Sequence, residues 1–331
     1  MKMLMVGAGA VGGQFGAYLH ESGADIHFLL RPARRQVIEA QGLNLDLPTG
    51  KLHLQPRTLV ASDLQPDYDL IIISCKAYSL NSVIKDITKA VGERTVILPL
   101  LNGLRHLDTL GHAFGHERVL GGIAKTVATL VSPSCIQIRH GPGNVTVGPR
   151  TPEQQAIAET VAATLHAGGV HTYFSEHIMD EMWDKYCLMA SLGAANCLLG
   201  GTVGEYMRSE AGGEIALQLF KECADTATAS GHALHPESIV RIQQALTNRQ
   251  SGFSASMYRD MQAGLPVEGD HLVGDMMRRG EALGITCPML KIAHAVLETY
   301  MGRREGQALR EQENTANSAT TFTTLAKKNV S

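Results

Sequence analysis

Hydrophobic residues form short continuous runs in the first part of the chain, and these runs alternate with amphipathic segments. The runs are MKMLMVG at 1–7, DIHFLL at 25–30, DLIIIS at 69–74 and TVILPLL at 95–101. Continuous apolar runs between helical patterns are typical of parallel strands that are covered on both faces. The pattern therefore predicts an α/β fold with a Rossmann-type, doubly wound sheet.

The pattern changes towards the end of this part. Residues 135–148 (CIQIRHGPGNVTVG) alternate about a Gly-Pro-Gly turn, which predicts an antiparallel hairpin added to the sheet. A helix over 152–167 and the strand VHTYFS at 170–175 are expected next. The first domain is therefore predicted to span residues 1–176.

The remainder of the chain has nearly only helical periodicity. Apolar residues recur at three- and four-residue spacing in segments that glycine or proline separates, at 177–199, 209–230, 236–248, 254–262, 267–283 and 288–301. We expect an all-helical second domain over 177–331. Its polar tail, from residue 303, loses the pattern.

Composition narrows the class of protein. With 331 residues, 44% hydrophobic, 18% charged and a net charge of -3, the chain is typical of a soluble enzyme and has no general electrostatic reason to bind nucleic acid or an anionic membrane.

The six cysteines are too widely spaced for a redox pair or a zinc motif, which favours a reducing compartment and no metal. No stretch approaches the ~18 apolar residues of a membrane helix. We expect a cytoplasmic protein.

Several glycines crowd the first strand and helix, in MLMVGAGAVGGQFGAYL at 3–19. Three of them fit G-x-G-x-x-G directly after a strand and at the start of a helix. The first allows a tight turn, the second lets a pyrophosphate approach, and the third lets helix and strand pack closely. The free N–H groups of the helix start favour a phosphate. The predicted phosphate-binding turn consists of Gly7, Ala8, Gly9, Ala10, Val11 and Gly12.

The end of the second strand indicates which dinucleotide binds. Enzymes that use NAD usually carry an acid there for the ribose 2′-hydroxyl, whereas this chain has Arg31, with Arg34 and Arg35 behind it. An arginine can pair with a 2′-phosphate through charge-assisted hydrogen bonds. This favours NADP(H), and the alternative is a solvated basic turn.

Two polar residues follow strands at the edge where open α/β sheets bind ligands. Lys76 comes after LIIISC and is a candidate for binding an adenine-side phosphate. Asn102, in LLNGL, is a candidate for the nicotinamide ribose or the substrate. Taken alone, each residue also suits an ordinary turn.

Lys185 interrupts a mainly apolar face of the helix predicted over 177–199. An unpaired ammonium on such a face is costly. Burial would lower its pKa and make it a competent proton donor to a carbonyl that is being reduced. The alternative is an exposed ion pair with Glu181, four residues earlier.

Two further candidates lie at predicted helix starts. Glu268 follows Pro266, and an acid in a first turn is ordinarily explained by the helix dipole. Ser256, in FSASMYRDM, is most simply a residue that begins a helix.

The motifs together resemble the ketopantoate reductases (2-dehydropantoate 2-reductases) to about residue 300. The resemblance rests on the glycine motif, Arg31, CKA around Lys76, NG at 102, WDK ending at Lys185, and SM at 256 followed by Glu268. It implies a Rossmann-type domain, a helical domain and a homodimer formed through the latter. It also implies reduction of 2-dehydropantoate to (R)-pantoate by NADPH, in pantothenate biosynthesis.

The resemblance also implies residue roles. The glycine turn would bind pyrophosphate, Arg31 and Lys76 the 2′-phosphate, and Asn102 the ribose and substrate region. Lys185 would donate the proton to the developing alkoxide. Glu268 would orient the substrate or the lysine.

Substrate contacts are where the chain departs from the family. Ser256 would contact the substrate carboxylate, but family asparagines four and eight residues after the lysine are replaced by Met189 and Gly193. Phe253 and Val203 stand at or near two other such positions. Since losing such hydrogen bonds costs about 1 to 3 kcal/mol each, we expect ketopantoate to bind weakly. A bulkier or more apolar 2-oxo acid, or a related ketone, would suit the changed wall better.

Two other functions remain open. One is an NADP(H)-binding sensor without turnover, which the lost asparagines favour slightly and which the retained Lys185 and Glu268 disfavour. The other is a related dehydrogenase that oxidises a hydroxy or imino acid.

Overall fold

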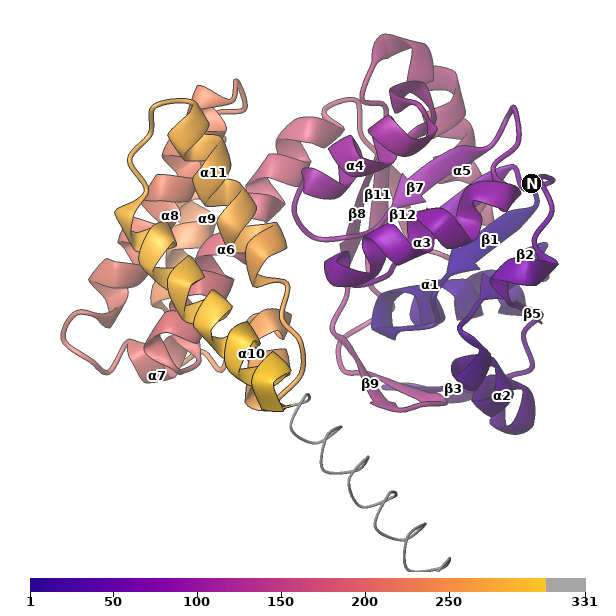
Figure 1. The fold of residues 1–331 in the computed structure, drawn as a ribbon, viewed down its shortest axis with the longest axis horizontal. Coiled ribbons are helices and arrows are strands. Elements are labelled where there is room, and N and C mark those ends of the chain that lie inside the picture. Colours follow the sequence, from indigo (N-terminus) through magenta and orange to yellow (C-terminus); the bar gives the residue numbers. More distant parts are fainter. Residues whose placement is uncertain (308–331) are drawn as a thin grey trace, which may run out of the picture. The chain divides into compact units, whose positions relative to one another are not determined.

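The protein, seen here in a computed structural model that describes residues 1–307, forms two compact units (Figure 1). The first is Met1–Tyr186 and the second begins at Cys187, so the division lies inside helix α6 (Ile178–Leu199). The boundary expected after residue 176 falls just before this helix. Of the polar tail, residues 303–307 continue a helix that begins at 288, and the rest lies outside the described residues.

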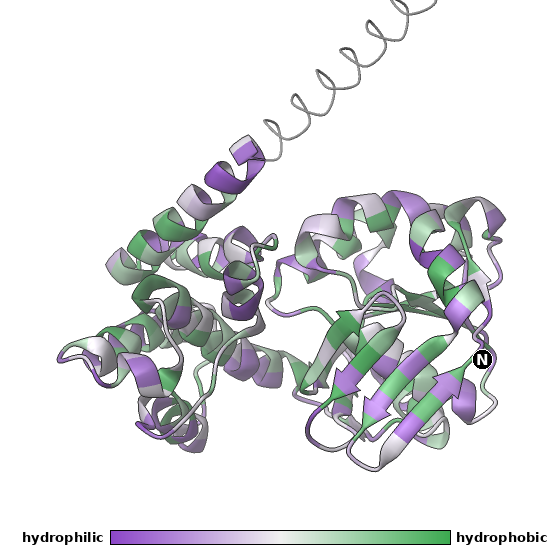
Figure 2. Cartoon of the chain, turned by 90° about the horizontal axis from the view of Figure 1, so that it is seen from below, coloured by the Kyte–Doolittle hydropathy of each residue, from purple (hydrophilic) through white to green (hydrophobic). Residues whose placement is uncertain are grey.

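A five-stranded parallel sheet is the centre of the first unit, as predicted. Its order is β5-β2-β1-β6-β7, and every residue of β1, β6 and β7 is buried. In Figure 2, hydrophobic (green) and hydrophilic (purple) residues alternate along the strands nearest the viewer. The strands are β1 (Met3–Val6), β2 (Ile26–Leu29), β5 (Thr58–Leu59), β6 (Leu70–Ile73) and β7 (Val96–Pro99).

Helices follow strands of the first unit where apolar residues recur on one face, as in α3, which buries Leu80, Val83 and Ile87. The helices are α1 (Ala10–Glu21), α2 (Pro32–Gln41), α3 (Leu80–Ile87), α4 (Arg105–Phe114) and α5 (Gln155–Ala167). Short 3₁₀ turns are η1 (Ala61–Asp63), η2 (Ala77–Ser79), η3 (Thr88–Ala90), η4 (His116–Arg118) and η5 (Pro152–Gln154).

Two smaller sheets complete the first unit. Sheet B has the order β4-β3-β10-β9 and sheet C the order β12-β11-β8. The strands of sheet B are β3 (Leu43–Leu47), β4 (Gly50–Leu54), β9 (Ala128–Ser132) and β10 (Cys135–Ile138). The strands of sheet C are β8 (Gly121–Lys125), β11 (Asn144–Gly148) and β12 (Thr172–Phe174).

The prediction of an antiparallel hairpin over residues 135–148 is wrong. Strand β10 pairs with β9 and β3, whereas β11 pairs with β8 and β12. Gly141 and Gly143 have φ of 55° and 67°, in the left-handed region, and lie in the segment that connects the two sheets. Alternating hydrophobicity located both strands correctly, but it carries no information about which strand lies beside which.

The second unit is helical, as predicted. A short helix near residue 203 was not predicted, and the segment 267–283 contains a π-helical turn that leads into α11. After α6 the elements are α7 (Val203–Tyr206), α8 (Gly212–Ala229), α9 (Pro236–Thr247), α10 (Ser256–Gln262), η6 (Asp270–Gly274), α11 (Asp275–Ala282) and a helix at 288–307. Within residues 1–307, none of the helices has the length and hydrophobicity needed to cross a membrane.

A buried carboxylate joins two of these helices. Glu222 of α8 is 1% exposed, and its two oxygens accept hydrogen bonds from the backbone N–H groups of Met289 (3.1 Å) and Leu290 (2.9 Å). These donors belong to the first turn of the helix at 288–307, where N–H groups lack partners within the helix. Glu222 therefore caps a helix that is distant in sequence.

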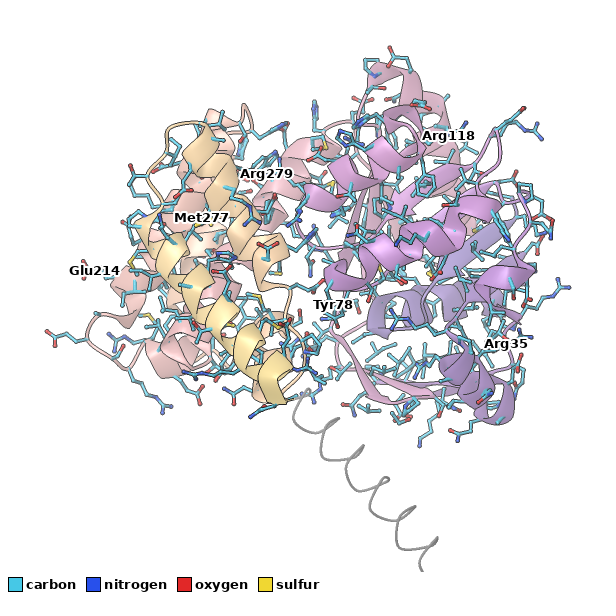
Figure 3. The ribbon with its side chains drawn as sticks, viewed as in Figure 1. Arg35, Tyr78, Arg118, Glu214, Met277 and Arg279 are labelled. Atoms are coloured by element: carbon cyan, nitrogen blue, oxygen red, sulfur yellow. The ribbon has the colours of Figure 1, made fainter. Side chains whose placement is uncertain are left out.

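We expect Glu222→Ala to lower the free energy of unfolding by about 2 to 4 kcal/mol, because the buried N–H of Leu290 and the partly buried N–H of Met289 lose their carboxylate acceptor. Urea denaturation followed by circular dichroism measures this change. Glu214→Ala, on the exposed surface of the same helix (Figure 3), is the matched control and should stay within about 0.5 kcal/mol of the wild type. Equal stability of the two variants would contradict the capping role.

Candidate active site

The glycine turn after β1 has the geometry that the motif predicts. Gly7 has a φ of 91°, which favours glycine over residues that carry a side chain. At Gly12, a Cβ atom would lie 2.0 Å from Ser74 Oγ and 2.4 Å from the Gly7 carbonyl oxygen. The first glycine therefore supplies the turn, and the third allows α1 to approach the sheet.

The space beside Gly9 is open. A Cβ atom built there would meet no heavy atom within 4 Å. Gly9 is the N-cap of α1, and no side chain caps the first turn of that helix. Backbone N–H groups at a helix start, next to room left by an absent side chain, fit a phosphate group.

Ser74 connects this turn to the neighbouring strand. The sequence analysis did not identify this residue. It follows β6, and its hydroxyl donates to the carbonyl oxygens of Val6 (3.1 Å) and Gly7 (3.4 Å). Strands β1 and β6 are parallel neighbours at the point where the strand order reverses, which is where open α/β sheets bind ligands. Ser74 holds the two strand ends together there.

The three arginines after β2 have different surroundings. Arg31 is exposed, and its Nη2 lies 3.4 Å from the hydroxyl oxygen of Ser79. Arg34 donates to the carbonyl oxygen of Ala8 (3.0 Å), and burial lowers its pKa. Arg35, labelled in Figure 3, pairs with Glu39 and Asp63. Arg31 thus contacts a hydroxyl, Arg34 braces the glycine turn, and the charge of Arg35 is neutralised.

Lys76 and Asn102 follow the two adjacent parallel strands β6 and β7. Both residues are half-buried, and Lys76 is the N-cap of η2, the turn that ends at Ser79. Because β1, β2, β6 and β7 are parallel, the residues that follow them lie along one edge of the sheet. The fold therefore brings the glycine turn, Arg31, Lys76 and Asn102 to the same edge.

Lys185 is held by a backbone carbonyl within the first unit. Its Nζ donates to the carbonyl oxygen of Ala124, the penultimate residue of β8, at 2.7 Å. The ammonium contacts this carbonyl, and the exposed ion pair with Glu181 is not formed. Burial is the main reason why the pKa of Lys185 is lowered to about 8, and the positive charge of Lys125 adds to the effect.

Glu268 and Ser256 lie in the second unit. Glu268 is 7% exposed and immediately precedes the helical turns at 269–274. The helix at 269–282 begins with a π turn, a feature often found at functional sites. Ser256 is the first residue of α10 and is half-buried.

Of the two α6 positions at which the resemblance implies asparagines, Gly193 is closely packed. A Cβ atom at Gly193 would lie 2.6 Å from Cε of Met257, which is 1% exposed, and Met189 is half-buried. The amide of Asn196 is engaged by the backbone, because it donates to the Gly201 carbonyl (2.8 Å) and accepts from the Ala255 N–H (2.9 Å). The polar atoms of Asn196 hold the backbone around α10.

Comparison with known families gives two matches that together cover most of the chain. Residues 3–152 match the family described as "Ketopantoate reductase PanE/ApbA", and residues 177–301 match "Ketopantoate reductase PanE/ApbA C terminal".

Relatives with similar sequences span nearly the whole chain. A Bacillus subtilis (strain 168) protein called "Uncharacterized oxidoreductase YkpB" is 31% identical over 300 residues, which is 91% of this chain and 99% of the relative. The 2-dehydropantoate 2-reductase of Streptococcus pyogenes serotype M6 is 26% identical over 295 residues, which is 88% of this chain and 95% of that enzyme.

Solved structures share the fold. A PanE/ApbA family ketopantoate reductase from Ralstonia eutropha JMP134 superimposes with a TM-score of 0.83 at 26% identity, covering 92% of this chain and 100% of the other. D-mandelate dehydrogenase, in a ternary structure with NADH and anilino(oxo)acetate, has a TM-score of 0.84 at 24% identity. The match covers 92% of this chain and 99% of that chain.

The pKa of Lys185 should respond to the charge of Lys125. We expect Lys125→Met to raise it above about 8, because a neighbouring positive charge disfavours the protonated form. Amine acetylation as a function of pH, quantified for Lys185 by mass spectrometry, measures this pKa. Lys221→Met, which removes a charge paired with Asp225, is the control and should have no effect. An unchanged pKa in Lys125→Met would refute the proposed charge effect.

Proposed function

The chain belongs to the ketopantoate reductase family, as the order of its motifs predicted, and on this premise we propose that it reduces a 2-oxo acid to the 2-hydroxy acid with NADPH. Membership makes the protein an oxidoreductase of the class that uses a nicotinamide cofactor. The observation that carries the proposal is the half-buried Lys185, whose ammonium is held by one carbonyl and whose pKa is lowered to about 8. If the substrate is ketopantoate, the reaction belongs to pantothenate biosynthesis.

The edge of the parallel sheet fits the cofactor. The open space at Gly9 and the uncapped start of α1 suit the pyrophosphate. Arg31 is proposed to bind the 2′-phosphate with the Ser79 hydroxyl and Lys76 beside it. Asn102 is proposed to contact the nicotinamide ribose and the substrate. The preference for NADPH over NADH then depends mainly on Arg31, since Arg34 and Arg35 are engaged elsewhere.

A bound NADPH would supply the hydride for the carbonyl carbon of the substrate. Lys185 donates a proton from Nζ to the carbonyl oxygen as negative charge develops on it, and it regains a proton from solvent after product release. Its lowered pKa brings the donor close to the pH at which the protein works, while most of it remains protonated near pH 7. Glu268 is proposed to orient the substrate or the lysine.

The substrate is proposed to carry an apolar group next to its 2-oxo acid function. Ser256 would bind the carboxylate. Met189 offers a thioether, and Gly193, which lies against Met257, offers no polar side chain. A pocket wall without amides does not satisfy a substrate hydroxyl, so ketopantoate should bind weakly. Assays of NADPH and NADH oxidation with ketopantoate, 3-methyl-2-oxobutanoate and phenylglyoxylate test this choice. Nucleotide binding without turnover of any of them would favour a sensor.

Lys185→Met should lower kcat for the best substrate by about 100- to 10,000-fold, because the proton donor is lost, while the Kd for NADPH stays within about twofold. Steady-state kinetics and fluorescence titration measure the two effects. In the wild type, kcat for reduction should fall as the pH rises through about 8, since the deprotonated amine has no proton to donate. A fully active Lys185→Met variant would remove the assigned role.

Arg31→Ala should raise KM for NADPH by about 10- to 100-fold and leave KM for NADH nearly unchanged, because only NADPH has the 2′-phosphate. Arg35→Ala, in the helix α2 of which Arg31 is the N-cap, is the matched control, since the Arg35 guanidinium is already paired with carboxylates, and it should change neither KM much. Equal effects of Arg31→Ala on both nucleotides would refute the preference for NADPH.

A further inference from the structure

The first residue of α6 fits against sheet C where two strands lack side chains. Ile178 is fully buried. A Cβ atom at Gly121 of β8 would lie 2.7 Å from Cγ1 and 2.8 Å from Cγ2 of Ile178. A Cβ atom at Gly148 of β11 would lie 2.5 Å from Cβ of Ile178 and 2.1 Å from the Ser175 carbonyl oxygen. Neither strand position can carry a side chain unless the start of α6 moves.

The two glycines are not required by backbone conformation. Neither Gly121 nor Gly148 has a positive φ, and they face each other in the antiparallel register of β8 and β11. Glycine inside a strand weakens the strand, and it often marks a close approach of another part of the chain. Space for Ile178 therefore explains Gly121, and space for Ile178 together with the Ser175 carbonyl oxygen explains Gly148.

Strand β8 is itself closely fitted to β7. A Cβ atom at Gly122 would lie 2.5 Å from the carbonyl oxygen of Pro99, the last residue of β7. An isolated parallel bridge between Ile97 and Val119 joins β7 to the residues just before β8. The surface that receives Ile178 is therefore tied to the parallel sheet whose edge carries the proposed cofactor-binding residues.

The distance from Ile178 to Lys185 along α6 matches the distance from Gly121 to Ala124 along β8. Lys185 is seven residues after Ile178, which is two turns and about 10 Å along an α-helix. Ala124 is three residues after Gly121, which is also about 10 Å along a strand. The lysine and the carbonyl meet at 2.7 Å. Fixing the first turn of α6 on β8 thus determines where the ammonium lies two turns later.

We propose that Gly121 and Gly148 form a socket for Ile178, and that this socket sets the register of α6 on β8 so that Lys185 is held at the carbonyl of Ala124. The three socket residues are positioning residues that act through Lys185. The consequence for turnover rests on the proposed function, whereas the consequence for the position of Lys185 does not.

Gly121→Ala tests the socket. The added methyl should displace α6 by roughly 1 Å, which is enough to lose a hydrogen bond of normal length. Exposure of the displaced amine should raise the pKa of Lys185 from about 8 towards the ordinary lysine value, as measured by pH-dependent acetylation and mass spectrometry. With a working substrate, kcat should fall about 10- to 100-fold, KM for NADPH should stay within about twofold, and the alkaline limb of kcat should shift with the pKa.

A double-mutant cycle separates the socket from a general loss of stability. Ile178→Ala removes both Cγ atoms that the new methyl would meet, so Gly121→Ala should have no further effect on the Lys185 pKa or on kcat in that background. Gly302→Ala, at a helical position where a Cβ atom meets nothing within 4 Å, is the control and should match the wild type.

Two outcomes would overturn the proposal. One is a folded Gly121→Ala variant that melts at a lower temperature but keeps the wild-type pKa of Lys185, which would make the contact merely structural. If Gly121→Ala does not fold, Ile178→Ala alone is decisive, because it creates a void without a clash and should still raise the pKa of Lys185 that pH-dependent acetylation measures; an unchanged pKa is the second such outcome. Because acetylation needs no substrate, these results stand even if no 2-oxo acid is turned over.

Discussion

The hydrogen bond from the Lys185 ammonium to the Ala124 carbonyl oxygen is the interaction on which the proposed chemistry depends. A charged amine withdrawn from water is unfavourable unless it has a hydrogen-bond partner. Here a single backbone oxygen is that partner, while burial and the charge of Lys125 keep the pKa near 8. The group therefore remains charged at neutral pH but loses its proton more easily than a lysine in water.

Glycines, which have no side chain, allow the close contacts at the glycine turn and between α6 and sheet C. Gly7 is required for its backbone conformation, whereas Gly12, Gly121 and Gly148 are required because other atoms occupy the space of a side chain. At Gly9 that space is open, which suits a ligand. Glycines with different physical roles thus shape both the proposed cofactor edge and the approach of α6 to sheet C.

Buried packing in the second unit surrounds Gly193 of α6. Met257 fills the space beside Gly193, so an asparagine at this position would require repacking of a buried methionine. The amide of Asn196 is satisfied by two backbone groups and stabilises the segment before α10. Gly193 and Met257 thus present no amide, which is the basis for proposing a more apolar substrate.

The sequence by itself determined the family, the parallel sheet, the helical second half and the glycine turn, because these depend on local periodicity and on motifs with fixed spacing. The sequence also identified Lys185 as an amine on an apolar helix face. Only the tertiary structure decided that its partner is the Ala124 carbonyl and not Glu181, that β10 and β11 belong to different sheets, and that Ser74 and Ser79 lie beside the glycine turn and Arg31, respectively. The physical reason is that strand pairing and burial depend on residues far apart in the chain, which spacing along one segment does not reveal.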